Sequence, residues 1–196
     1  MNSEFILTQG AGQKLEFAVQ RNGGTTTDID WLSAGDNFKK VSLLARGQAG
    51  ITIVEHIIDL DAPPLIPVAD WSVEEHRPGG KWKWGPSRVD LWLSPDQQNG
   101  KVVTGHELAK QWAKRSVFNA NLLDYLLDHP QLIPESWKQD EQGQTLLIYF
   151  PGTKYRDSDG NLYVRYLYWR GGHWQADGHW LDDDWDEQCP AAVLAS

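Results

Sequence analysis

Residues 161–180 read NLYVRYLYWRGGHWQADGHW, and this stretch decides the expected fold. Its first half is dense in tyrosine and other large residues that favour a strand. The DSDG sequence at 157–160 has the residues of a tight turn, and TLLIYF at 145–150 supplies a strand before it. We therefore predict a tryptophan-rich antiparallel sheet over residues 145–196, with an irregular course of strand and loop after Gly172.

Two helices are predicted upstream of this sheet. Over residues 119–129 leucines recur at helical spacing, Asn119 fits the N-cap position, and a proline follows. Over residues 106–115, Thr104 and Glu107 precede the apolar positions with the spacing of a capping box. Both stretches therefore predict amphipathic helices that bury their apolar faces.

The centre of the chain predicts short strands. The β-branched run ITIVEHIIDL at 51–60 is typical of a strand. Three aromatic runs at 71–77, 81–84 and 89–93 are separated by turn residues and predict two or three antiparallel strands. Between them and the first run, the proline-rich segment 61–71 can be neither a helix interior nor a central strand, so we expect a long connection or a domain boundary there.

Residues 1–49 predict a small helical unit. Glycine pairs interrupt short apolar patterns, Thr27 and Asp28 fit a helix cap, and an apolar residue recurs every third position from Phe38. Residues 50–196 would then form a second domain. The predicted fold class is α+β, with a short helical N-terminal unit, a mixed central unit and a tryptophan-rich antiparallel C-terminal sheet.

Composition restricts the function and the compartment. Of 196 residues, 40% are hydrophobic and 23% charged, as in an ordinary globular protein. The net charge of −9 and the lack of a basic run argue against general nucleic-acid binding. With Cys189 alone, no intrachain disulfide can form, which fits a reducing compartment. We find no export signal and no long apolar stretch, so we expect a cytoplasmic protein with no membrane contact.

The segment from Trp169 to Trp185 has the most unusual composition. It contains four tryptophans, two histidines and four aspartates. Tryptophan offers a large, rigid contact area, and aspartate and histidine add directional hydrogen bonds, as in faces that bind sugars, peptides or proteins. The alternative is that the tryptophans form the hydrophobic core of a small sheet.

A metal site is the rival interpretation of this segment. Imidazole and carboxylate groups together suit zinc, manganese or iron, which would make the protein a metal-dependent hydrolase or nuclease. The spacing matches no standard ligand pattern. The candidate ligands are His173, His179, Asp182, Asp183, Asp184 and Asp186.

Other catalytic patterns are weak. Glu74 and His76 could share one face of a strand, but such a pair is common on protein surfaces. Asp157 and Asp159 resemble the start of a calcium loop, but Tyr168 stands at the twelfth position, where a glutamate would be needed. No phosphate loop, nucleophile elbow or HExxH helix is present in the sequence. We therefore assign no catalytic residue, no metal and no cofactor.

Three stretches resemble an uncharacterised group of bacterial hypothetical proteins. They are ADWSVEEHRPGGKWKW at 69–84, NANLLDYLLDHPQLIPESWK at 119–138, and YRDSDGNLYVRYLYWRGGHW at 155–174, which leads to the ending PAAVLAS. In that group the segment that matches residues 174–190 varies among polar residues between constant tryptophans. This is similar to the variable tails of binding proteins that retroelements diversify.

The aromatic and acidic density of the C-terminal segment favours a non-catalytic binding or interaction protein whose contact face lies there, and the resemblance to diversified binding proteins implies polar ligand-facing positions in the same segment. Its partner would be a protein or a small ligand. A third hypothesis is an accessory protein of a mobile element, in which residues 1–50 dock independently to a partner. The expected ligand-binding residues are Trp174, Gln175, Asp177, His179, Asp183, Trp185, Asp186 and Gln188.

Overall fold

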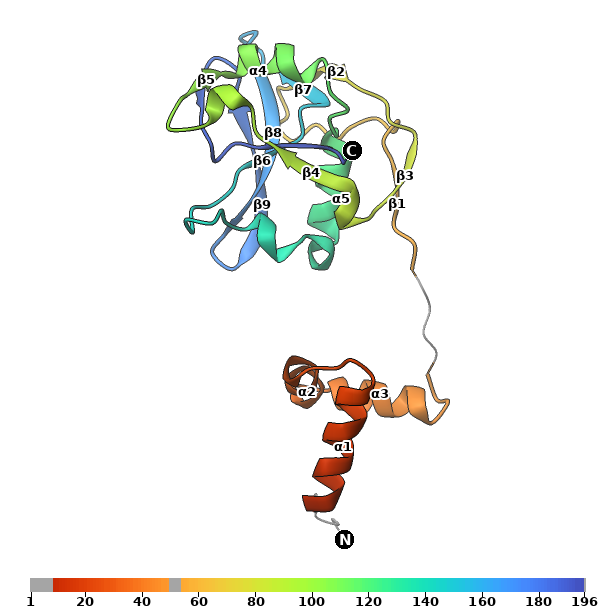
Figure 1. Cartoon of the computed structure of the whole chain (residues 1–196). Helices are drawn as coiled ribbons and strands as arrows, with labels where there is room; N and C mark the ends of the chain where they lie inside the picture. The colour runs from red at the N-terminus through yellow and green to blue at the C-terminus, as the bar shows by residue number, and fades with distance from the viewer. Residues whose placement is uncertain (1–8, 50–53, 196) are drawn as a thin grey trace. The chain divides into compact units, whose positions relative to one another are not determined.

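The computed structural model describes residues 9–49 and 54–195 (Figure 1). The chain divides into two compact units, Met1–Val54 and Glu55–Ser196. Their positions relative to one another are not determined, so each unit is described by itself. No helix of the described ranges is long and apolar enough to cross a membrane.

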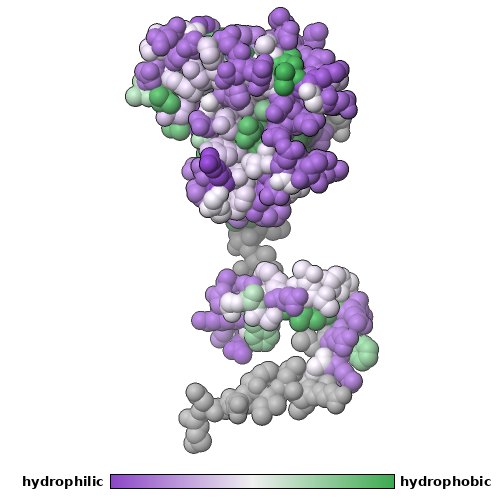
Figure 2. Space-filling view, turned by 90° about the vertical axis from the view of Figure 1, so that its left-hand side faces the viewer, coloured by the Kyte–Doolittle hydropathy of each residue, from purple (hydrophilic) through white to green (hydrophobic). Residues whose placement is uncertain are grey.

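The first unit contains three short helices, α1 (Gln9–Arg21), α2 (Thr26–Ser33) and α3 (Asn37–Ala45). The N-cap of α2 is Thr25 and not Thr27, whereas Asp28 takes part in the cap as the N3 residue of a capping box. The Asp28 carboxylate accepts hydrogen bonds from the Thr25 backbone N–H at 2.7 Å and from its hydroxyl at 2.9 Å. No residue of α2 or α3 is buried, and apolar side chains lie on the surface of this unit (Figure 2).

The second unit has an α+β fold, as predicted. Its helices are α4 (Gly105–Trp112) and α5 (Ala120–Asp128), with single 3-10 turns at Pro86–Arg88, Pro95–Gln97, Pro130–Leu132 and Glu135–Trp137. Its strands are β1 (Ile57–Asp59), β2 (Ser72–His76), β3 (Lys81–Lys83), β4 (Val89–Trp92), β5 (Val103–Thr104), β6 (Ile148–Tyr149), β7 (Thr153–Arg156), β8 (Leu162–Arg170), β9 (His173–Trp180), β10 (Asp184–Trp185) and β11 (Ala191–Leu194).

A seven-stranded sheet forms the centre of this domain. Six strands follow the order β2-β7-β8-β6-β11-β4, and β9 pairs with β8. All pairs are antiparallel except β6 with β11, which are parallel at the single pair Ala191 and Tyr149, so the sheet is mixed and its C-terminal part is predominantly antiparallel, as predicted. The strands of the three aromatic runs at 71–77, 81–84 and 89–93 do not pair with one another: β2 joins β7, β4 joins β11, and β3 joins β1.

Each face of the sheet has its own hydrophobic core. On one face lie α5 and the β1–β3 pair, which contribute Leu122, Leu126 and Trp82 to a core with Leu167 of β8. On the other face lie α4 and the β5–β10 pair. Their buried side chains pack against Tyr149 and Val164. Strand β8 pairs with β6, β7 and β9 and has a hydrophobic core on each face, so it is the central strand of the domain (Figure 1).

Of the two predicted helix caps, Asn119 makes a side-chain cap bond and Thr104 does not. The Asn119 side chain accepts a hydrogen bond from Asn121 N–H at 3.2 Å, and its amide group also donates to the carbonyls of Leu60 at 2.7 Å and Arg77 at 2.9 Å. Thr104 stands at the N-cap of α4 but makes no side-chain cap bond. Asn119 therefore connects α5 to two distant segments, which local capping rules do not predict.

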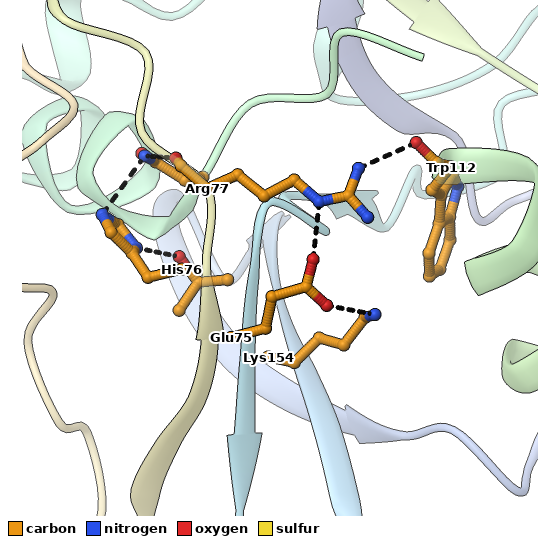
Figure 3. Close-up of polar contacts among 7 residues, drawn as sticks. Glu75, His76, Arg77, Trp112 and Lys154 are labelled. Atoms are coloured by element: carbon orange, nitrogen blue, oxygen red, sulfur yellow. Dashed lines mark hydrogen bonds and ion pairs between the residues drawn. The ribbon is translucent and has the colours of Figure 1, made fainter. Parts of the chain in front are cut away.

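A network of polar contacts joins β2 to its neighbours (Figure 3). Arg77 donates to Glu75 at 2.7 Å and to the carbonyl of Trp112 at 2.9 Å, and Lys154 of β7 contacts Glu75 at 2.6 Å. On the opposite side of the strand, His76 contacts the hydroxyl of Thr153 at 2.8 Å. These contacts hold the edge strand β2 on β7 and connect it to the end of α4.

Candidate binding face on the C-terminal sheet

The strands β8 and β9 form a long hairpin whose residues alternate between the two faces of the sheet. Their register pairs Tyr166 with Asp177, Tyr168 with Gln175, and Val164 with His179. Because paired residues of an antiparallel ladder project to the same side, these side chains share one face. The prediction of an irregular course after Gly172 is wrong here, since β9 is a regular strand of eight residues.

We call the polar part of this face the C-terminal strip. It contains two half-buried tyrosines of β8, three polar residues of β9 and one residue of the following turn. Its members are Tyr166, Tyr168, Gln175, Asp177, His179 and Asp183. Tyr168 donates its hydroxyl hydrogen to the Gln175 side-chain oxygen at 3.2 Å, and Asp177 is exposed beside Tyr166. The strip therefore presents aromatic rings beside carboxylates and an amide.

His179 is a half-buried residue of the strip. Its Nδ1 lies 2.7 Å from the Tyr149 hydroxyl, and its Nε2 lies 3.6 Å from the Asp183 carboxylate. The ring of Trp185 lies below it, with centroids 4.7 Å apart. Burial lowers the pKa of His179, although Asp183, Asp186 and Asp177 oppose this effect. The imidazole is therefore neutral at pH 7, and its Nδ1 shares a hydrogen bond with the Tyr149 hydroxyl.

Neighbouring groups also hold their protons. Burial raises the pKa of the Tyr149 hydroxyl well above its usual value, and it raises the pKa of the Cys189 thiol to about 12. A cysteine nucleophile requires a thiolate, which a partner histidine normally stabilises by becoming charged. Here the thiol stays protonated and the imidazole stays neutral. This protonation pattern opposes thiol catalysis and favours a structural role for Cys189.

Two of the predicted ligand-binding tryptophans do not lie on the strip. Trp185 is fully buried and packs against Trp112 and Tyr149, so the prediction that it contacts a ligand is wrong. Trp174 projects to the opposite face of the sheet, because it differs from Gln175 by one position in the strand. There it packs edge-to-face on Trp169, with ring centroids 5.4 Å apart.

Trp174 lines a separate small pocket on that opposite face. The pocket has a volume of about 360 Å³ and is also lined by Trp169, Lys138 and His173. The ammonium group of Lys138 lies 3.8 Å from the centre of the Trp169 ring and pairs with Glu135. The aromatic face of Trp169 is thus already covered by a cation from the same chain.

Asp186 and Gln188 lie in the loop that follows β10, beside the strip. The Asp186 carboxylate accepts hydrogen bonds from the Gln188 backbone N–H at 2.9 Å and from the Cys189 thiol at 3.5 Å. The Gln188 side chain contacts Gln144. The Asp186 carboxylate therefore stabilises the loop to which it belongs, and the Gln188 side chain connects that loop to the turn before β6.

The residues proposed for a metal site do not come together. His173 and His179 stand at opposite ends of β9, and six strand residues span roughly 20 Å. One ion cannot bind both. Within residues 9–49 and 54–195, no group of three or more His, Cys, Asp or Glu side chains is placed to hold a metal ion. The two imidazoles also have different partners: Asp183 faces His179, whereas His173 contacts the carbonyl of Gly171.

The side chains of Glu74 and His76 also lie apart, because each contacts different partners. Glu74 binds Arg156 at 2.8 Å on the surface, whereas His76 contacts Thr153 and the carbonyl of Leu60 in the interior. A register shift between Val73 and Glu75 contributes to this arrangement. Both residues stabilise the position of β2.

The sequence interpretation missed the tyrosines of the strip. Tyr166 and Tyr168 alternate with Leu167 in a predicted strand, so their common face could have been read from the period of two. The pairing of these tyrosines with residues of β9 could not be predicted, because the sequence pattern did not indicate a regular strand at β9. Comparison of the chain with protein-family models, curated proteins and solved structures gives no match.

Proposed function

We propose that the domain formed by residues 55–196 is a non-catalytic binding module and that the C-terminal strip is its contact face. The observation that carries this proposal is the register of β8 on β9, which aligns Tyr166 with Asp177 and Tyr168 with Gln175 on one face. Aromatic rings beside directional polar groups are typical of protein contact surfaces.

The chemistry of the strip supports binding over catalysis. Its histidine is neutral, and the cysteine beside it is protonated. The charged groups of the strip are carboxylates, and the whole chain has a net charge of −9. A partner with basic side chains therefore has electrostatic complementarity to this face. Tyrosine rings also attract cations through their π-faces.

The test compares strip variants in a direct affinity measurement. A partner is first captured with the purified full-length chain, identified and purified. Its affinity is then measured calorimetrically for the wild type, for Tyr168→Ala and for Asp177→Asn. Loss of an aromatic anchor typically costs more than about 1 kcal/mol, so Tyr168→Ala should weaken binding by about fivefold or more.

The matched control lies away from the strip. Trp92→Phe changes an aromatic residue of β4, which stands at the other end of the strand order from β2 and pairs with β11 rather than with β8 or β9. It should leave the affinity within about twofold, since it removes no strip contact. Equal affinities for wild type and Tyr168→Ala, with both proteins folded, would exclude the strip as the contact face.

A further inference from the structure

Strand β9 is an edge of the central sheet, and its outward backbone groups can be identified. Within the described residues, β9 pairs with β8 alone. Just beyond β9 on the same ladder, Leu181 N–H donates to the Leu162 carbonyl at 2.8 Å. Hydrogen bonding alternates along an antiparallel ladder, so the odd-numbered residues of β9 bond to β8. The N–H and C=O groups of Trp174, Ala176, Gly178 and Trp180 therefore point away from β8.

Part of this edge is already satisfied by local contacts. Gly178 N–H donates to the Asp177 carboxylate at 2.7 Å, and the Trp180 carbonyl accepts from Asp183 N–H at 3.2 Å. The outward groups of Trp174 and Ala176 lie between these contacts and the turn at Gly171-Gly172. This segment offers two consecutive outward-facing positions for pairing with another strand.

The side chains on the strip face next to this edge are one carboxylate, one amide and two tyrosine rings. Asp177 of β9 is exposed on the same face as Tyr166 and Tyr168. Charge is also unevenly distributed along the chain, because the residues before Glu55 contain five basic and five acidic residues. The formal charge of −9 therefore belongs to the domain that contains β9.

From the open edge and this charge we infer that the partner of the C-terminal strip is an extended peptide segment with lysine or arginine at alternate positions, which adds to β9 as an antiparallel strand. This inference rests on the proposed function and specifies its ligand. The added backbone would pair with Trp174 and Ala176. Its basic side chains would lie on the strip face beside Asp177 and the tyrosines, whereas its intervening side chains would project to the other face.

The experiment uses the full-length chain and synthetic ten-residue peptides. The probe alternates lysine with threonine, and its charge-reversed counterpart alternates glutamate with threonine. In antiparallel addition with lysines on the strip face, the threonine N–H groups point to β9 and the lysine N–H groups point to solvent. N-methylation of two threonines should therefore weaken binding by about tenfold, whereas N-methylation of two lysines should change it by less than about threefold.

Side-chain variants give a second readout. Asp177→Asn keeps an oxygen that can accept from Gly178 N–H and removes the charge, so it should weaken binding of the lysine peptide by about two- to fivefold. Asp90→Asn removes an exposed carboxylate from β4, at the other end of the strand order, and serves as the matched control. Its effect should stay within measurement error.

Two results would overturn the inference. One is equal binding of both methylated peptides and the unmodified probe, which would show that backbone pairing is not used. The other is binding of the glutamate peptide as tightly as the lysine peptide. Neither result contradicts the proposed function. That function is excluded only if the strip variants leave the affinity for the purified partner unchanged.

Discussion

At the scale of single residues, position in a strand decides which aromatic side chains are available to a ligand. Trp174 and Gln175 are neighbours in sequence, yet one packs on the larger core and the other lies on the strip. Trp185 belongs to the smaller core, where a fully buried indole contributes about 1.5–3 kcal/mol or more through removal of its surface from water. Composition alone could identify the segment as unusual, but it could not show that these tryptophans pack in the two cores while the polar residues between them lie at the surface.

The first prediction concerns His179 and pH. Its pKa is lowered in the folded state, so below its ordinary value of 6.5 the unfolded chain takes up a proton more readily than the folded chain. The contribution of His179 to stability is therefore complete above pH 6.5 and decreases as the pH falls below that value. Urea denaturation at about pH 7.5 and 5.5 should show that His179→Gln loses less stability on acidification than the wild type.

The control for this prediction is Gln175→Ala, since Gln175 lies on the same strand and carries no ionisable group. Its pH dependence should match the wild type. If His179→Gln and the wild type lose the same free energy of unfolding between the two pH values, burial does not control the protonation of His179.

At the scale of elements, local patterns predicted helices better than strand partners. The leucine spacing and Asn119 cap correctly predicted α5, and the DSDG turn correctly placed the connection between β7 and β8. Strand pairing depends on contacts far apart in sequence, such as β2 with β7 and β4 with β11. The local spacing of apolar residues does not determine these pairings, because any strand with an apolar face fits several partners.

The second prediction compares two N-cap positions. Asn119→Ala removes the cap of α5 and two hydrogen bonds to the carbonyls of Leu60 and Arg77, which leaves buried acceptors without these partners. We expect a loss of about 2–4 kcal/mol in the free energy of unfolding. Thr104→Ala removes a side chain that makes no cap bond, and it should cost less than about 0.5 kcal/mol.

Chemical denaturation of both variants tests this comparison. Equal losses at the two positions would contradict the assigned role of Asn119, because they would show that its tertiary contacts add nothing to helix capping. A larger loss for Thr104→Ala would have the same meaning.

At the scale of the whole molecule, the two units differ in how they are stabilised. The unit that begins at Glu55 has a hydrophobic core on each face of its sheet. In the first unit, Phe17, Trp31 and Phe38 are 67%, 54% and 66% exposed, and α2 and α3 contain no buried residue. Helices of 8 to 13 residues are marginal in water without tertiary packing.

The third prediction follows from this difference. A chain that begins at Glu55 should fold with a thermal midpoint within about 3 °C of the full-length protein, because both hydrophobic cores lie within it. A peptide of residues 1–49 should show weak helical circular dichroism that increases in trifluoroethanol. A truncated domain that unfolds more than about 10 °C earlier would show that the first unit supplies essential packing to the second.

Amide chemical-shift mapping of the domain with its purified partner locates the contact face residue by residue. If the C-terminal strip is the contact face, the largest changes fall on β8 and β9, at Tyr166, Tyr168 and residues 174–177, with smaller changes elsewhere in the domain. Changes concentrated instead around Lys138 and Trp169, or along β4 and β11, would contradict this assignment, because the contact face would then lie away from the C-terminal strip.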